Sequence, residues 1–204
     1  MSPVPGPPPG NVYDKYGTRN PIERRLVRGF LDQLDALVDR TGAREAHEIG
    51  CGEGELCVRL AKRGLRVRGT DVSPEVIAEA RRRAAPMRVG IDFQALPVEE
   101  LDPGRDAAEL VLCCEVMEHL DGPDAALDQL AGLARPWAIV SVPREPLWRA
   151  LNLARLAYVP ALGNTPGHLN HWSRRGFITF LERRFEVVEV HSPFPWTMAL
   201  CRAR

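Results

Sequence analysis

The sequence EIGCGEGE at residues 48–55 places three glycines between a β-type run and a segment with helical spacing. The β-type run covers residues 46–49, and the helical segment covers residues 54–63. A glycine loop that joins a strand to a helix lies at the carboxyl edge of a parallel sheet, where open α/β folds bind their ligands. The run therefore predicts an α/β fold with a ligand site at the end of its first strand.

The acidic residues of this loop distinguish between two kinds of nucleotide ligand. A dinucleotide fingerprint has its third glycine one position later, but this chain has Gly54 followed by Glu55. The carboxylates of Glu53 and Glu55 would repel a pyrophosphate at the helix N-terminus, whereas a ligand with sulfonium and ammonium groups tolerates them. We therefore expect S-adenosylmethionine (SAM), rather than a nicotinamide dinucleotide, at Gly50, Gly52 and Gly54.

An aspartate follows the next β-type run, where a ribose would lie beside the glycine loop. Asp71 comes seventeen residues after Gly54, and its carboxylate can accept hydrogen bonds from both ribose hydroxyls. In the structural alternative the glycines make only a tight turn, and Asp71 with Ser73-Pro74 caps a helix. The agreement of loop, carboxylate and strand order favours the nucleoside site.

β-type and helical runs alternate through most of the chain, which predicts a parallel sheet wrapped by helices. An amphipathic helix begins at Asn20-Pro21 and ends before Gly42. Prolines at 193 and 195 lie in a short gap between the last two β-type runs, which suits an antiparallel hairpin at the sheet edge. The predicted strands are 46–49, 66–70, 91–94, 110–114, 138–142, 186–190 and 197–201, and the later predicted helices are 54–63, 74–84, 123–134 and 174–183.

Composition limits the class of protein and the kinds of partner. Residues 1–10 contain five prolines and two glycines, so we predict a disordered tail over 1–12 and a single domain over 13–204. The 27 cationic and 27 anionic side chains cancel, which disfavours a nucleic-acid partner. Five cysteines without a C-x-x-C pair, together with the absence of a long apolar run or a signal-peptide pattern, predict a reduced protein of the cytoplasm.

Residues 144–172 interrupt the alternation after the fifth predicted strand and are predicted to form a helical insertion. Its predicted apolar face carries Leu147, Trp148, Leu151, Ala154 and Tyr158, and its predicted polar face carries Arg149, Asn152 and Arg155. Three interpretations are open: a lid over the acceptor, an extra packed helix, or a surface for a lipid-linked substrate.

Three segments, EIGCGEG at 48–54, TDVS at 70–73 and CEVMEHL at 114–120, resemble the methyltransferases of ubiquinone and menaquinone biosynthesis. The resemblance implies a Rossmann-like, doubly wound sheet of seven strands in the order 3-2-1-4-5-7-6, with the last strand antiparallel. It also implies SAM as cofactor and methyl transfer to a small-molecule or lipid-like acceptor. The implied cofactor contacts are Glu48, Gly50, Gly52, Gly54, Asp71, Val72, Pro97, Val98 and Glu115. Among them, Asp71 would hold the ribose, Val72 would pack on the adenine, and Glu115 would lie near the methionine amino group.

Two histidines lie on the acceptor side of the predicted site. His119 follows the fourth predicted strand directly, and His168 lies near the end of the insertion. In-line methyl transfer requires alignment of acceptor and methyl group and, for some acceptors, removal of one proton. Either histidine is a candidate base near neutral pH. The alternative is that both belong to a turn and a loop without a chemical role.

The spacing Glu115-x-x-Glu118-His119, together with His168, also resembles the small-RNA 3′-terminal 2′-O-methyltransferases, whose metal would fall on these four residues. That family has an Asn and an aromatic pair after the proline of its fifth strand, but here REPL follows Pro143. We therefore predict a site without metal and activity that persists in excess chelator. Metal-dependent RNA methylation and a SAM-binding module without turnover are the two alternatives.

Overall fold

The computed structural model describes residues 18–204, so the tail predicted at 1–12 lies outside the described residues. The strands are β1 (Glu45–Ile49), β2 (Arg66–Asp71), β3 (Ile91–Ala95), β4 (Ala108–Cys114), β5 (Ala134–Pro143), β6 (Phe185–His191) and β7 (Trp196–Ala203). They form one seven-stranded sheet in the order β3-β2-β1-β4-β5-β7-β6. The pairs among β1 to β5 are parallel, and β7 is antiparallel to both β5 and β6. The predicted Rossmann-like topology is confirmed.

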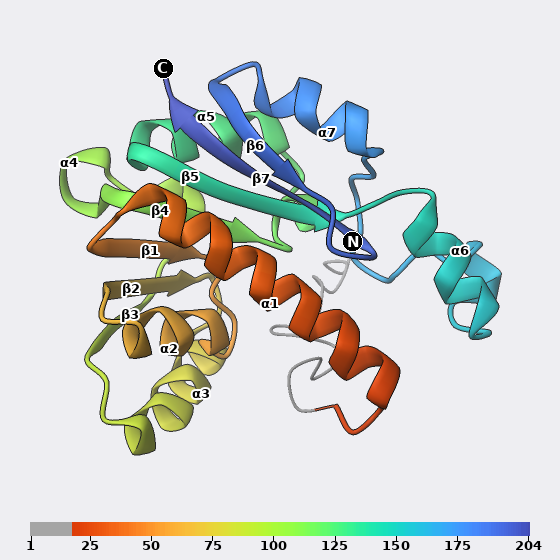
Figure 1. Cartoon of the computed structure of the whole chain (residues 1–204), viewed down its shortest axis with the longest axis horizontal. Helices are drawn as coiled ribbons and strands as arrows, with labels where there is room; N and C mark the ends of the chain where they lie inside the picture. Colours follow the sequence, from red (N-terminus) through yellow and green to blue (C-terminus); the bar gives the residue numbers. More distant parts are fainter. Residues whose placement is uncertain (1–17) are drawn as a thin grey trace, which may run out of the picture.

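Helices cover both faces of this sheet. The described residues form α1 (Pro21–Thr41), α2 (Glu55–Lys62), α3 (Pro74–Ala84), α4 (Pro103–Asp106), α5 (Pro123–Leu133), α6 (Leu147–Ala154) and α7 (Arg174–Leu181). Helices α1, α2 and α3 pack on one face, and α5 and α7 pack on the other (Figure 1). Helix α6 projects beyond the end of the sheet, at the right of Figure 1.

The central strand β4 contributes to both halves of the core. Leu110 and Leu112 belong to the cluster with α1, α2 and α3, whereas Val111 and Cys113 belong to the cluster with α5 and α7. None of these four side chains is more than 2% exposed. Burial on both faces is typical of parallel strands covered by helices. Because β4 is packed on both sides, its carboxyl end is held in place between the two helical layers.

Local signals begin and end the first helix at the predicted positions. The Asn20 side chain accepts a hydrogen bond from the Ile22 N–H at 3.0 Å, and Pro21 occupies the first helical position. Gly42 adopts the left-handed conformation with φ of 62°, which ends α1 without the cost that a Cβ would impose.

The predicted bounds of the two longest strands were too short. Strand β5 was predicted over 138–142 and β7 over 197–201, but their antiparallel pairing extends from Trp137 opposite Arg202 to Pro143 opposite Trp196. Backbone hydrogen bonds continue beyond the apolar pattern on which the prediction relied, because a ladder needs no apolar side chain at every position.

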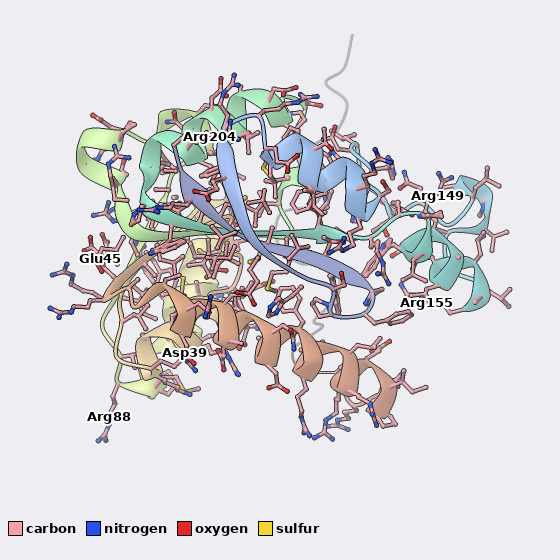
Figure 2. The ribbon with its side chains drawn as sticks, turned by 45° about the horizontal axis from the view of Figure 1, so that its top comes forward. Asp39, Glu45, Arg88, Arg149, Arg155 and Arg204 are labelled. Atoms are coloured by element: carbon pink, nitrogen blue, oxygen red, sulfur yellow. The ribbon has the colours of Figure 1, made fainter. Side chains whose placement is uncertain are left out.

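The predicted faces of the insertion were wrong. Helix α6 ends at Ala154, so Tyr158 does not belong to it. Asn152, predicted on a polar face, is only 2% exposed. Its buried amide is satisfied by hydrogen bonds that it donates to the Gly163 carbonyl at 2.8 Å and to Thr165 Oγ1 at 3.1 Å. Arg149 and Arg155 do lie on this projecting part of the molecule (Figure 2).

The five cysteines are all buried thiols without disulfide bonds, as predicted for a reduced core. In the part of the chain that the structure describes, no helix combines the length and the apolar character needed to cross a membrane.

A buried carboxylate stabilises the edge of the sheet opposite the glycine loop. Asp106, whose side chain is 1% exposed, accepts hydrogen bonds from Arg68 Nη1 at 2.8 Å and from Arg105 Nη2 at 2.9 Å. The Asp102 N–H donates to the same carboxylate at 2.9 Å. The pKa of Asp106 lies below its usual value, chiefly because Arg105 donates to its charged form.

We predict that Asp106→Ala lowers the free energy of unfolding by about 2 kcal/mol, because it removes the buried carboxylate to which Arg68, Arg105 and the Asp102 N–H donate, although Arg68 keeps Asp92 as an ion-pair partner. The matched control is Asp124→Ala, since Asp124 and its partner Arg183 are 68% and 54% exposed, and exposed pairs contribute less than about 1 kcal/mol. Urea titration measures both. A lowered carboxyl pKa contributes stability that is lost as pH falls through that pKa, so the Asp106 effect should shrink in acid. Equal effects of the two variants at neutral pH would contradict the prediction.

Candidate functional site

The glycine loop leaves β1 in a conformation that requires glycine. Gly50, Gly52 and Gly54 have φ angles of 69°, 52° and 81°. A Cβ on Gly54 would lie 2.8 Å from the ring of Phe93, and a Cβ on Gly50 would lie 2.4 Å from Val116 Cγ2. Both positive φ and close approach therefore exclude a side chain at positions 50 and 54. The loop brings the chain directly from β1 into the N-terminus of α2.

Asp71 holds this loop from the end of β2. Its Oδ2 accepts a hydrogen bond from the Gly52 N–H at 3.0 Å, and its Oδ1 accepts one from the Ser73 N–H at 3.1 Å. The hydroxyl of Ser73, rather than Asp71, caps α3 by accepting from the Val76 N–H at 3.3 Å. Each carboxylate oxygen retains a second lone pair that can accept from a ligand hydroxyl.

Apolar residues flank Asp71 on the side away from the loop. Val72 is 70% exposed, which is unusual for a valine that follows a buried strand. The Leu96 N–H donates to the Asp71 carbonyl at 2.9 Å and thereby ties the segment after β3 to this strand end. Pro97 and Val98, both partly buried, follow at the start of a 3₁₀ turn.

Two glutamates lie at the carboxyl ends of β1 and β4. Glu48 is 4% exposed and accepts from the Cys57 thiol of α2 at 2.9 Å, so it lies beneath the loop. Burial raises the pKa of Cys57 well above its usual value, which keeps the thiol as the donor. Glu115 has a left-handed φ of 61° and accepts from the Ser141 hydroxyl at 3.1 Å. A residue other than glycine in this conformation often marks a functional constraint.

The turn after β4 meets the end of the insertion. One ligand atom each from Glu118, His119 and His168 lies within 4.8 Å of the other two, and the two imidazole rings are 4.9 Å apart, edge to face. Nδ1 of His119 lies 2.9 Å from the Gly167 carbonyl oxygen. Because a carbonyl can only accept, Nδ1 carries the proton of the neutral ring and Nε2 carries the lone pair.

His168 is neutral at physiological pH. Its side chain is buried, and burial lowers its pKa to about 4, with further lowering by the charges of His119 and His171. His171 itself is exposed and bonds to Asn164 Oδ1 at 2.7 Å. Of the four residues with metal-type spacing, the group of converging side chains contains three and does not include Glu115.

An asparagine that the sequence analysis missed joins the two segments. The Asn170 amide donates to the Leu120 carbonyl at 2.6 Å and to the Met117 carbonyl at 3.2 Å. The backbone N–H groups of Asn170 and Leu169 donate to the Glu118 carbonyl at 3.0 and 2.8 Å. In the sequence, only the position of this asparagine between two histidines, in HLNH, indicated that it could belong to the site. Its hydrogen-bond partners could not be predicted, because they are about fifty residues away in sequence.

Aromatic side chains border the histidines. The Trp148 ring stacks on His168 at a centroid distance of 6.2 Å, and Trp196 lies 5.9 Å from Trp148. Phe30 of α1 contacts Trp196 edge to face at 5.2 Å. The Trp148 indole N–H donates to Thr165 Oγ1 at 2.9 Å, which fixes its ring. The acceptor side therefore combines imidazole nitrogens with an aromatic wall.

Comparison with known proteins shows which family the chain resembles in sequence. Residues 46–137 match the family model described as a methyltransferase domain. A ubiquinone biosynthesis O-methyltransferase of Bradyrhizobium diazoefficiens is 31% identical over 172 residues, which cover 78% of this chain and 67% of that protein. The chain thus spans about two thirds of that relative's length.

Solved structures share the fold. Magnesium protoporphyrin IX methyltransferase from Synechocystis PCC 6803, with bound S-adenosylhomocysteine (SAH), has a TM-score of 0.70 at 20% identity and covers 92% of this chain and 89% of that chain. The N-methyltransferase NodS from Bradyrhizobium japonicum WM9, in complex with SAH, has a TM-score of 0.68 at 22% identity and covers 94% and 93%.

The sequence match, the glycine loop with Asp71 and the strand order lead to the same assignment. SAM is accordingly the methyl donor. The chain belongs to the class I SAM-dependent methyltransferases and is a distant homologue of the ubiquinone biosynthesis O-methyltransferases.

Proposed function

We propose that this methyltransferase methylates a hydroxyl group of a small-molecule or lipid-linked acceptor. The observation that carries the proposal is the pair of His119 and His168 beyond the end of β4, which offers an imidazole that can accept a proton. The name of the Bradyrhizobium diazoefficiens relative, an O-methyltransferase, supports oxygen as the acceptor atom. The balanced charge supports an acceptor other than nucleic acid, and five reduced thiols support a cytoplasmic location.

The residues around the glycine loop fit SAM, whose charged groups are cationic apart from one carboxylate. The fit rests on the donor set: Glu115 beside the methionine end, Asp71 with free lone pairs for the ribose, and exposed Val72 for the adenine. The proposed cofactor-binding residues are Glu48, Gly50, Gly52, Gly54, Asp71, Val72, Pro97, Val98 and Glu115. Glu48 contributes from beneath the loop through its contact with Cys57.

His119 supplies the proton acceptor in this mechanism. When bound, SAM provides an activated methyl group on a sulfonium, whose sulfur takes the electron pair of the breaking carbon–sulfur bond. Nε2 of His119 accepts the hydroxyl proton of the acceptor as the new carbon–oxygen bond forms. His168 remains neutral beside it and therefore adds no charge that would oppose protonation of His119. Trp148, which is half-buried beside His168 and packs on the buried Trp196, offers the aromatic surface for the apolar part of the acceptor.

A second candidate is metal-dependent O-methylation, and one observation favours it. The converging group of Glu118, His119 and His168 offers one carboxylate and two imidazoles, a mixed donor set that suits a divalent cation such as Mn²⁺ or Zn²⁺. A cation there would orient and acidify the acceptor hydroxyl, including a ribose 2′-hydroxyl. The first proposal needs no ion, so the two candidates differ in their response to chelation.

We predict that Asp71→Ala weakens SAM binding by about 2 to 3 kcal/mol, because it removes two charge-assisted hydrogen bonds to the ribose. Calorimetry with SAM and SAH measures the effect, and NAD should give no binding to the wild-type chain. The matched control is Asp92→Ala, since Asp92 is an exposed carboxylate on β3 that pairs with Arg68. An unchanged dissociation constant for Asp71→Ala would contradict a role of Asp71 in cofactor binding, and a lowered thermal midpoint would then show that its bonds to Gly52 and Ser73 are structural.

We predict that methylation persists in excess chelator, because His119 can accept the proton without an ion. The measurement is transfer of label from methyl-labelled SAM to fractionated cell extract, followed by identification of the labelled acceptor. The opposite outcome is equally clear: activity lost in chelator and restored by a divalent cation, with His168→Ala raising the cation concentration required. That result would establish the second candidate, because loss of one ligand from a true site weakens metal binding steeply.

A further inference from the structure

One asparagine side chain spans the whole turn that carries His119. The amide of Asn170 donates to carbonyls at both ends of this turn, those of Met117 and Leu120, and its backbone N–H donates to the carbonyl of Glu118 between them. Three carbonyl groups of one short turn thus accept hydrogen bonds from a single residue of the insertion.

The turn needs these external donors because it contains few internal hydrogen bonds. Met117–His119 is a single 3₁₀ turn, held by a 2.9 Å bond from the His119 N–H to Val116 and a 3.4 Å bond from the Leu120 N–H to Met117. Short 3₁₀ segments have poor internal geometry, so their conformation depends on what packs against them.

The same bonds set the register between the turn and the loop. Asn170 lies three residues after Gly167, and the Leu169 N–H bond to the Glu118 carbonyl fixes the chain between them. In this register the Gly167 carbonyl lies 2.9 Å from Nδ1 of His119. A loop displaced by one residue would present an N–H or a side chain to that nitrogen in place of a carbonyl oxygen.

We propose that Asn170 is a positioning residue that determines the tautomer of His119. Through its three hydrogen bonds it holds the Gly167 carbonyl against Nδ1, so that the neutral ring keeps its proton on Nδ1 and its lone pair on Nε2. The inference rests on the proposed role of His119 as the base, but it concerns the ring itself and can be tested without an acceptor.

The amide group is essential to this role. Aspartate has the same shape, but it has no N–H donor and would direct a carboxylate at two carbonyl oxygens. Asn152 provides a matched comparison in the same insertion: it is more deeply buried, and its amide also donates to a backbone carbonyl, that of Gly163. The side-chain bonds of Asn152 go to Gly163 and Thr165, and not to the turn at Met117–His119.

The test is nitrogen NMR of the histidine rings at pH 8, in chelator, with the His119 signals assigned by comparison with His119→Gln. We expect wild type and Asn152→Asp to show a pyrrole-type Nδ1 and a pyridine-type Nε2 for His119. In Asn170→Asp this pattern should collapse or reverse, because an unconstrained histidine in water favours the proton on Nε2. Should the aspartate variant fail to fold, Asn170→Ser carries the same expectation.

Cofactor binding separates this inference from the proposed function. The Asn170 hydrogen bonds described above go to residues 117–120 and not to the glycine loop, so SAM should bind Asn170→Asp within about twofold of wild type, a difference under about 0.5 kcal/mol. An unchanged His119 pattern in a folded Asn170→Asp would overturn the inference, and so would an equal change in Asn152→Asp, which would indicate general loosening of the insertion. If the wild-type chain did not bind SAM, the proposed function would be refuted, but the NMR result would still report on the His119 tautomer.

Discussion

At Gly54 the chain passes so close to the ring of Phe93 that no side chain fits, and the arrangement of the cofactor edge depends on that contact. The close approach lets α2 begin directly over β3, with Ala80 of α3 also within contact distance. The loop is thereby drawn down onto the sheet, where Asp71 can accept from the Gly52 N–H. Backbone N–H groups, a carboxylate and an exposed valine then lie at one strand edge, which is the arrangement that a nucleoside ligand requires.

The cluster of Glu118, His119 and His168 is built differently, because its side chains come from a turn and from the insertion rather than from the ends of neighbouring strands. The turn after β4 supplies Glu118 and His119, and the insertion supplies His168 and the carbonyl that contacts His119. The family match ends at residue 137, before the insertion begins. Glu118 and His119 therefore lie inside the matched segment, whereas His168 and Asn170 lie outside it.

Sequence reasoning succeeded where a local pattern determines the structure and missed what depends on distant partners. Glycine spacing and the alternation of runs predicted the loop, the parallel sheet and the position of Asp71, because each depends on neighbouring residues and on topology rules. The strand order was implied by the resemblance to a known family. The burial of Asn152 and the bonds of Asn170 could not be predicted, since their partners are carbonyl groups with no side-chain signature. The role of Ser73 as the cap of α3 was visible in the sequence only as one of two possibilities.

The position of β7 imposes an order on assembly of the sheet. This strand follows β6 in the chain but lies between β5 and β6, and the residues from 196 to 201 are all buried. Strand β6 therefore joins the sheet only through β7, whose other partner, β5, lies more than fifty residues earlier in the chain. During synthesis the edge of β5 stays uncovered until β7 pairs with it. Such late, non-local pairing slows folding and exposes an open strand edge to other chains, a period in which a chaperone would protect the molecule.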